Sequence, residues 1–196
     1  MNFVSTPDLA RWPGLARVSL GGAGLACWVA MGRTTVYTDG ACLGNPGPGG
    51  WAWALPGGRW RSGAEAHTTN QRMELTAALD AARTLTGPLE VVSDSTYVVN
   101  CFKQRWWVKW LANGWVSSTK KPVANRDLWE PLVGLYRDAP GRIELRWVKG
   151  HASDPFNDLV DRLAVAAAGS QRGGEGDRPP GANDLGLPDE PVSWRR

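Results

Sequence analysis

Cysteine is scarce in this chain, which narrows the kinds of site it can hold. Only three cysteines occur among the 196 residues, namely Cys27, Cys42 and Cys101, and no two of them form a Cys-x-x-Cys pair. An odd, scattered set suits a reducing compartment better than a disulfide framework or a zinc site. We therefore expect a cytoplasmic protein.

Long apolar runs are missing as well. No stretch reaches the roughly 18 apolar residues of a membrane span, so the sequence predicts none. Residues 15–31 faintly resemble a signal sequence, but they are Gly-rich and weakly apolar and lack a clear cleavage site, so we do not expect secretion. Nothing indicates an obligate protein partner, and we expect a monomer.

Acidic residues are absent between Asp94 and Asp127. Basic residues and tryptophans interleaved in this way are typical of nucleic-acid contact. The alternative is a solvated helix face whose tryptophans are buried elsewhere. The local excess of positive charge favours contact with nucleic acid. The basic residues and tryptophans of this segment are Lys103, Arg105, Trp106, Trp107, Lys109, Trp110, Trp115, Lys120, Lys121 and Arg126.

The two ends of the chain have little hydrophobic pattern. Residues 1–32 are rich in Gly, Ala and Pro, and we treat them as an extension whose order the sequence does not predict. Residues 169–196 are rich in Gly, Pro and charge, which predicts a disordered tail. The single domain is therefore expected over residues 33–168.

Within this domain the spacing of hydrophobic residues changes from a period of two residues, typical of strands, to one of 3.6 residues, typical of helices, and back. The first three strands are expected to be antiparallel, and the later strands to be joined by helical crossovers, which predicts an α/β fold with a five-stranded mixed sheet flanked by helices. The expected strands are 34–42, 50–55, 59–66, 89–93 and 142–148. A helix is expected over 70–85 and a helical region over about 95–112. A further helix, capped by Asn125 or Asp127, is expected to run to Arg137, and a last helix is capped by Asp154 and opened by Pro155.

Four acidic positions fall where such a fold collects ligands. Asp39 and Asp94 lie toward the carboxyl ends of the first and fourth strands, which are expected to be parallel neighbours. Glu74 lies in the first turns of its helix, and the last helix offers Asp158 and Asp161. Each of these residues alone is explained as a turn residue, a cap or a surface charge. Together they predict a cation site, because clustered carboxylates repel one another.

The motifs around these positions resemble those of bacterial ribonuclease H type 1. The similarity covers about Thr34 to Ala168 and rests on five segments in the family's order: YTDGACLGNPGPGGWAW, TTNQRMELTAAL, SDSTYV, KKPVANRDLW and WVKGHASDPFNDLVDRLA. The resemblance implies a ribonuclease H-like fold and a ribonuclease H catalytic domain. It also implies an endonuclease that cuts the RNA strand of RNA–DNA hybrids with little sequence preference and leaves 5′-phosphate and 3′-hydroxyl ends.

The resemblance also implies a metal centre. Asp39, Glu74, Asp94 and Asp161 would hold two Mg²⁺ ions, for which Mn²⁺ could substitute, and His151 would assist proton movement or product departure. The spacing from His151 favours Asp161 over Asp158, which stays the alternative. The sequence does not decide between one and two metal ions at working concentrations.

Substrate contacts follow from the same resemblance. Asn45, Asn70 and Gln71 would read the RNA strand through its 2′-hydroxyls, Thr69 and Asn125 would form a phosphate pocket, and Trp106 and Trp110 would pack against deoxyribose. Trp129 and Trp147 are assigned to the core. Two other functions stay open: a hybrid-binding module without turnover, and an integrase-like strand-transfer nuclease.

Overall fold

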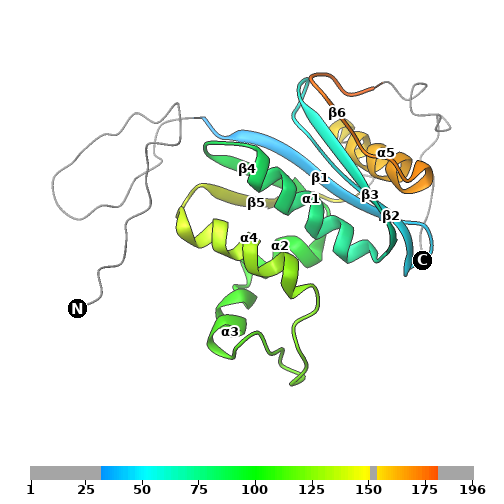
Figure 1. Cartoon of the computed structure of the whole chain (residues 1–196). Coiled ribbons are helices and arrows are strands. Elements are labelled where there is room, and N and C mark those ends of the chain that lie inside the picture. The colour runs from blue at the N-terminus through cyan, green and yellow to red at the C-terminus, as the bar shows by residue number, and fades with distance from the viewer. Residues whose placement is uncertain (1–31, 151–153, 181–196) are drawn as a thin grey trace, which may run out of the picture.

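Parallel and antiparallel strand pairs share one sheet, with helices on both of its faces (Figure 1). The computed structural model describes residues 32–150 and 154–180. The strand order is β5-β4-β1-β2-β3-β6. The strands are β1 (Thr34–Cys42), β2 (Gly47–Ala54), β3 (Trp60–Thr68), β4 (Leu89–Ser93), β5 (Ile143–Trp147) and β6 (Gly174–Gly176).

Five helices complete the described part of the chain: α1 (Asn70–Thr84), α2 (Thr96–Lys103), α3 (Trp106–Ala112), α4 (Arg126–Asp138) and α5 (Pro155–Ser170). None of them is long and apolar enough to cross a membrane. The predicted antiparallel arrangement of the first three strands and the parallel pairing of β1 with β4 are both confirmed.

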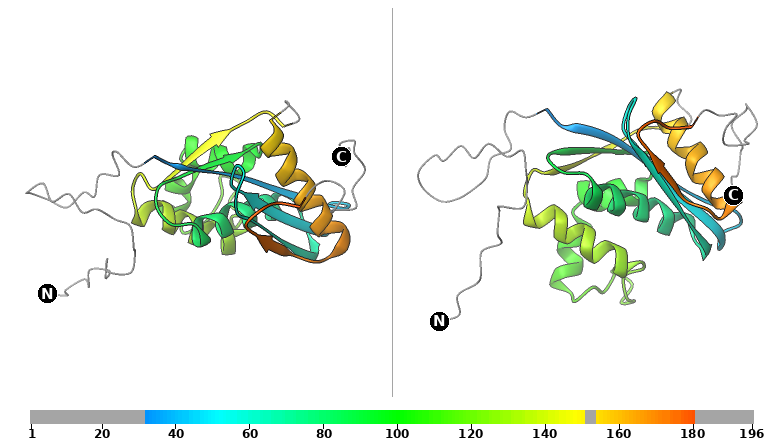
Figure 2. Two further views of the ribbon diagram at one scale, coloured as in Figure 1. Left: turned by 90° about the horizontal axis from the view of Figure 1, so that it is seen from above. Right: turned by 45° about the horizontal axis from the view of Figure 1, so that its top comes forward.

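Two cores lie on opposite faces of the sheet because successive strand residues point to opposite sides. Val36 and Val91 pack with α1, α2 and α4 on one face. Tyr37 and Val92, the next residues on the same strands, pack with α5 on the other face. Figure 2 shows α5, in orange, across the sheet from α1 and α4.

The expected helical region over 95–112 is confirmed, and it consists of two helices, α2 and α3. Arg105 has a left-handed backbone with φ of 56°, which interrupts the helical hydrogen bonds between α2 and α3. The axis changes direction there, and Trp110 on α3 lies against the buried Trp129 on α4, with ring centroids 5.5 Å apart. A local hydrophobic period does not reveal this break, because one residue changes the direction of the chain.

The prediction of five strands was also wrong, because the sheet has six. β6 lies inside the segment 169–196 that was expected to be a disordered tail, and it pairs with β3 in antiparallel fashion. Its glycines let the backbone pass over the indole of Trp60, since a Cβ at Gly174 would lie 2.8 Å from that ring. The Trp60 indole nitrogen donates to the Arg178 carbonyl at 2.8 Å. Residues 181–196 of the expected tail lie outside the described residues.

Removal of β6 is expected to lower stability without affecting the distant part of the sheet. A chain ending at Gln171 loses the ladder to β3 and the cover on Trp60, so we expect a loss of about 1 kcal/mol, or about 2–4 °C in Tm. A chain ending at Pro180 keeps β6 and serves as the matched control in thermal unfolding. Equal Tm values for the two truncated chains would contradict a stabilising role for β6.

Candidate active site

Strand pairing brings Asp39 and Asp94 to one place on the sheet. The parallel register of β1 and β4 ends at the pair Tyr37 and Val92, and each Asp lies two residues beyond its member of that pair. Adjacent strands are about 5 Å apart, so the two residues start from neighbouring backbone positions. Asp39 is still within β1, whose pairing with β2 continues, and it is 6% exposed. Asp94 follows the last residue of β4.

Close packing of α1 on β1 brings Glu74 to the same place. A Cβ at Gly40 would lie 2.2 Å from the backbone nitrogen of Glu74, so only glycine permits this approach. The Glu74 carboxylate accepts hydrogen bonds from the Ser95 hydroxyl and from the Asn70 side-chain amide, the latter at 2.8 Å. Ser95 is the N-cap of α2 and directly follows Asp94. These contacts tie α1 to the start of α2.

The last helix supplies the fourth carboxylate from the opposite face. Asp154 caps α5 as predicted, accepting hydrogen bonds from the backbone nitrogens of Phe156 and Asn157 at 3.1 and 3.3 Å. Asp161, two turns along this helix, acts electrostatically on Asp39, whereas Asp158 is not among the groups that shift the pKa of Asp39. His151 lies outside the described residues, and its role stays a prediction.

The surroundings of this acidic cluster, which comprises Asp39, Glu74, Asp94 and Asp161, disfavour the ionised forms of Asp39 and Glu74. Burial raises the pKa of Asp39 well above 3.8, the charges of Asp94, Asp161 and Glu74 raise it further, and the Gly40 N–H lowers it. Burial likewise raises the pKa of Glu74 from 4.5 to about 7, with the hydrogen bond from Ser95 opposing that shift. A cation would remove this penalty, because an opposite charge nearby favours the ionised form.

The donor set fits a hard divalent cation, which prefers carboxylate oxygens. Among residues 32–150 and 154–180, no three His, Cys, Asp or Glu side chains already form a cluster that could hold a metal.

Most of the predicted substrate residues gather where β3 meets α1. The Asn45 side-chain oxygen accepts a hydrogen bond from the Asn70 backbone at 3.3 Å. Thr69 is the N-cap of α1, and its hydroxyl accepts from the Arg72 backbone. Gln71, next to Asn70, is exposed. The structure therefore groups Asn45, Thr69, Asn70 and Gln71 at the start of α1, the helix that carries Glu74.

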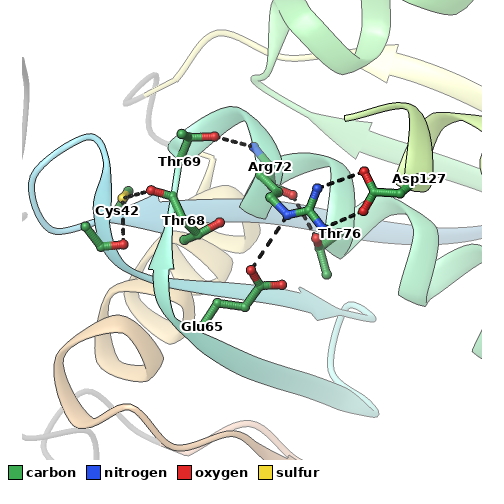
Figure 3. Close-up of polar contacts among 8 residues, drawn as sticks. Cys42, Glu65, Thr68, Thr69, Arg72, Thr76 and Asp127 are labelled. Atoms are coloured by element: carbon green, nitrogen blue, oxygen red, sulfur yellow. Dashed lines mark hydrogen bonds and ion pairs between the residues drawn. The ribbon is translucent and has the colours of Figure 1, made fainter. Parts of the chain in front are cut away.

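Arg72 is a residue of this region that the sequence did not single out (Figure 3). Its guanidinium donates two hydrogen bonds to Asp127, at 2.9 and 2.5 Å, and forms an ion pair with Glu65 at 3.7 Å. Asp127 lies two residues after Asn125, so this contact links the Thr69 side of α1 to the start of α4. Asn125 has a left-handed backbone and donates to the Tyr97 hydroxyl at 3.4 Å. Spacing alone did not reveal the partner of Arg72, because Asp127 is 55 residues away.

The tryptophans divide between surface and core. Trp106 and Trp110 lie on α3 with ring centroids 6.3 Å apart, and both are partly exposed. Trp129 is fully buried, which confirms its assignment to the core. The same assignment was wrong for Trp147, which is 43% exposed at the end of the edge strand β5. Its indole nitrogen donates to the Asp94 backbone carbonyl at 3.1 Å, so this residue lies next to the candidate site.

The raised pKa of Glu74 predicts how stability changes with pH in the metal-free protein. The pKa of Glu74 is about 7 in the folded protein against an ordinary value of 4.5, so protonation of this carboxyl favours the folded state. This contribution to stability is fully present below pH 4.5. That contribution is lost as the pH rises through about 7, on the order of 3 kcal/mol. Chemical denaturation from pH 4.5 to 8 in a chelator should show this fall, and Glu74→Gln should reduce it. An unchanged pH profile in Glu74→Gln would contradict the assignment.

Comparisons with known proteins agree with this geometry. The family model for RNase H matches residues 31–169. "Ribonuclease H" of Moorella thermoacetica is 49% identical over 72% of this chain and 95% of its own length, and that of Symbiobacterium thermophilum is 49% identical over 72% and 99%.

Two solved structures are also similar. The crystal structure of LC9-RNase H1, "a type 1 RNase H with the type 2 active-site motif", has a TM-score of 0.62 and 31% identity, and the match covers 82% of this chain and 84% of that one. The foamy viral protease-reverse transcriptase in complex with dsDNA shares the fold, with a TM-score of 0.61 and 22% identity over 70% of this chain and 95% of that chain. With its strand order, its acidic cluster and these relatives, the chain belongs to the RNase H family.

Proposed function

We propose that this protein is an endonuclease that hydrolyses the RNA strand of RNA–DNA hybrids, with little sequence preference, leaving 5′-phosphate and 3′-hydroxyl ends. The observation that carries the proposal is the gathering of Asp39, Glu74 and Asp94, with Asp161 acting on Asp39, at the junction of β1 and β4. Membership of the RNase H family supports the substrate. We also propose that the protein acts as a cytoplasmic monomer.

The four carboxylates would hold divalent cations, and we propose two Mg²⁺ ions, with Mn²⁺ as a substitute. Bound ions would supply a water of lowered pKa and stabilise charge on the leaving oxygen. Asp39 is central in this proposal, because each of the other three carboxylates raises its pKa. Asp161 is preferred to Asp158 for the same reason. His151 would move a proton or assist product departure, a role that suits its near-neutral reference pKa.

Recognition of the hybrid would use two surfaces. Asn45, Asn70 and Gln71 have amide groups that can donate to and accept from a 2′-hydroxyl, and Asn70 contacts both Glu74 and Asn45. Thr69 and Asn125 would contact phosphate of the DNA strand, with Arg72 holding their two helices together. Trp106 and Trp110 on α3 would pack against deoxyribose, among the basic residues of that segment.

Asp39→Asn is expected to abolish strand-specific cleavage of a labelled hybrid in Mg²⁺ and to leave hybrid binding nearly unchanged. The substitution keeps the shape of the side chain and removes the charge shared by the cluster. Asp138→Asn, an exposed residue at the end of α4, is the matched control and should cleave normally. Activity of Asp39→Asn within tenfold of the unaltered protein would refute the assignment. Binding without cleavage by the unaltered protein would indicate the module without turnover, and cleavage of duplex DNA would indicate the integrase-like alternative.

Hybrid affinity is expected to fall linearly on a log–log plot as salt rises, because phosphate contacts release counterions. Lys109→Ala, on α3, should reduce the slope by about one. Arg83→Ala, an exposed residue in the last turn of α1, removes an equal charge from the end of that helix away from Glu74 and should leave the slope unchanged. A flat salt response in the unaltered protein would exclude the basic segment as the binding surface.

A further inference from the structure

The Asp94 carboxylate is confined by two residues that the proposed chemistry does not use. The side-chain nitrogen of Asn157, on α5, donates to Asp94 Oδ2 at 3.4 Å, a long hydrogen bond. A Cβ at Gly150 would lie 2.5 Å from the same oxygen, so the chain before α5 also passes close to it. The two contacts place Gly150 and Asn157, which lie before and within the first turn of α5, against the residue that follows β4.

Asn157 is an unusual residue for its position. It is 3% exposed, and its side-chain oxygen is buried with no hydrogen-bond partner among the residues that the structure describes. Burying an amide without satisfying it costs free energy, whereas an apolar side chain of similar size would fill the space without that cost. Packing alone therefore does not account for an amide here, and its polar contact with Asp94 does.

The helix that carries Asn157 is itself fixed to the strand that carries Asp39. The Asp154 cap accepts a hydrogen bond from the Tyr37 hydroxyl at 3.2 Å, and Tyr37 and Phe156 have ring centroids 5.4 Å apart. Tyr37 lies two residues before Asp39 on β1. Asn157 is thus held relative to Asp39 while it contacts Asp94, which suits a residue that sets the distance and direction between the two carboxylates.

We propose that Asn157 is a positioning residue that orients the Asp94 carboxylate toward the shared cation site. The inference rests on the proposed function, since it concerns the same cluster. The negative charges of Asp39 and Glu74 repel Asp94, and a donor on Asp94 Oδ2 limits the rotation that would relieve this repulsion. Partners in the second layer around a metal site commonly change metal affinity or activity by about 10–100-fold when they are removed.

The test compares Asn157→Leu, which keeps a similar volume and removes both amide atoms, with Val160→Ala. Val160 lies on the same helix and is fully buried, so its truncation disturbs packing and removes no hydrogen bond to Asp94. Asn157→Ala is the second variant if the leucine does not fold. Mg²⁺ affinity is measured by calorimetry on the free protein, together with kcat and KM for a hybrid and thermal unfolding.

The expected result is a loss of about 10–100-fold in Mg²⁺ affinity or in kcat for the Asn157 variant, with KM within about threefold. Val160→Ala should lower Tm and leave both quantities unchanged. Values within twofold of the unaltered protein for the Asn157 variant, or an equal loss in Val160→Ala, would overturn the proposal. If the unaltered protein binds Mg²⁺ but does not cleave hybrids, the proposed function fails, and the calorimetric comparison still decides the role of Asn157.

Discussion

Repulsion among carboxylates around the buried Asp39 is the constraint on which the rest of this structure depends. The parallel pairing of β1 and β4 places Asp39 and Asp94 at neighbouring positions, and burial of Asp39 withholds the water that would otherwise screen its charge. A cluster of this kind is unfavourable in isolation and becomes favourable with a cation. The fold therefore maintains an unfavourable arrangement of charges, and the proposed metal ions would offset its cost.

The elements around the cluster oppose its tendency to spread apart. Glu74 is held by Ser95 and Asn70, and Asp94 is held by Asn157 at its carboxylate and by Trp147 at its backbone carbonyl. These contacts come from both faces of the sheet. Glu74 and Asp94 are thus each supported by an element other than their own, which couples the arrangement of these two carboxylates to formation of the whole fold.

The proposed recognition surfaces lie apart from the elements that stabilise the sheet edge. The tryptophans of α3 lie on the α4 side of the molecule, and Arg105 gives α3 a direction of its own (Figure 1). β6 closes the opposite edge beside β3, at the end of that strand away from α1. Stability and substrate contact can therefore be altered separately, which makes the truncation and the salt experiments independent.

The sequence by itself determined the strands β1 and β4 and the cap and first residue of α5, and it singled out the acidic residues of the proposed site. Each of these is a local signal: β-branched runs for Thr34–Cys42 and Leu89–Ser93, and Asp154 followed by Pro155. Only the tertiary structure decided the sixth strand, the break at Arg105, the exposure of Trp147 and the contact of Asn157 with Asp94. The physical reason is that each of these depends on residues distant in sequence or on the direction of a neighbouring helix: Gly174 pairs across 112 residues, and Asn157 reaches Asp94 across 63. Local periodicity carries no information about such partners.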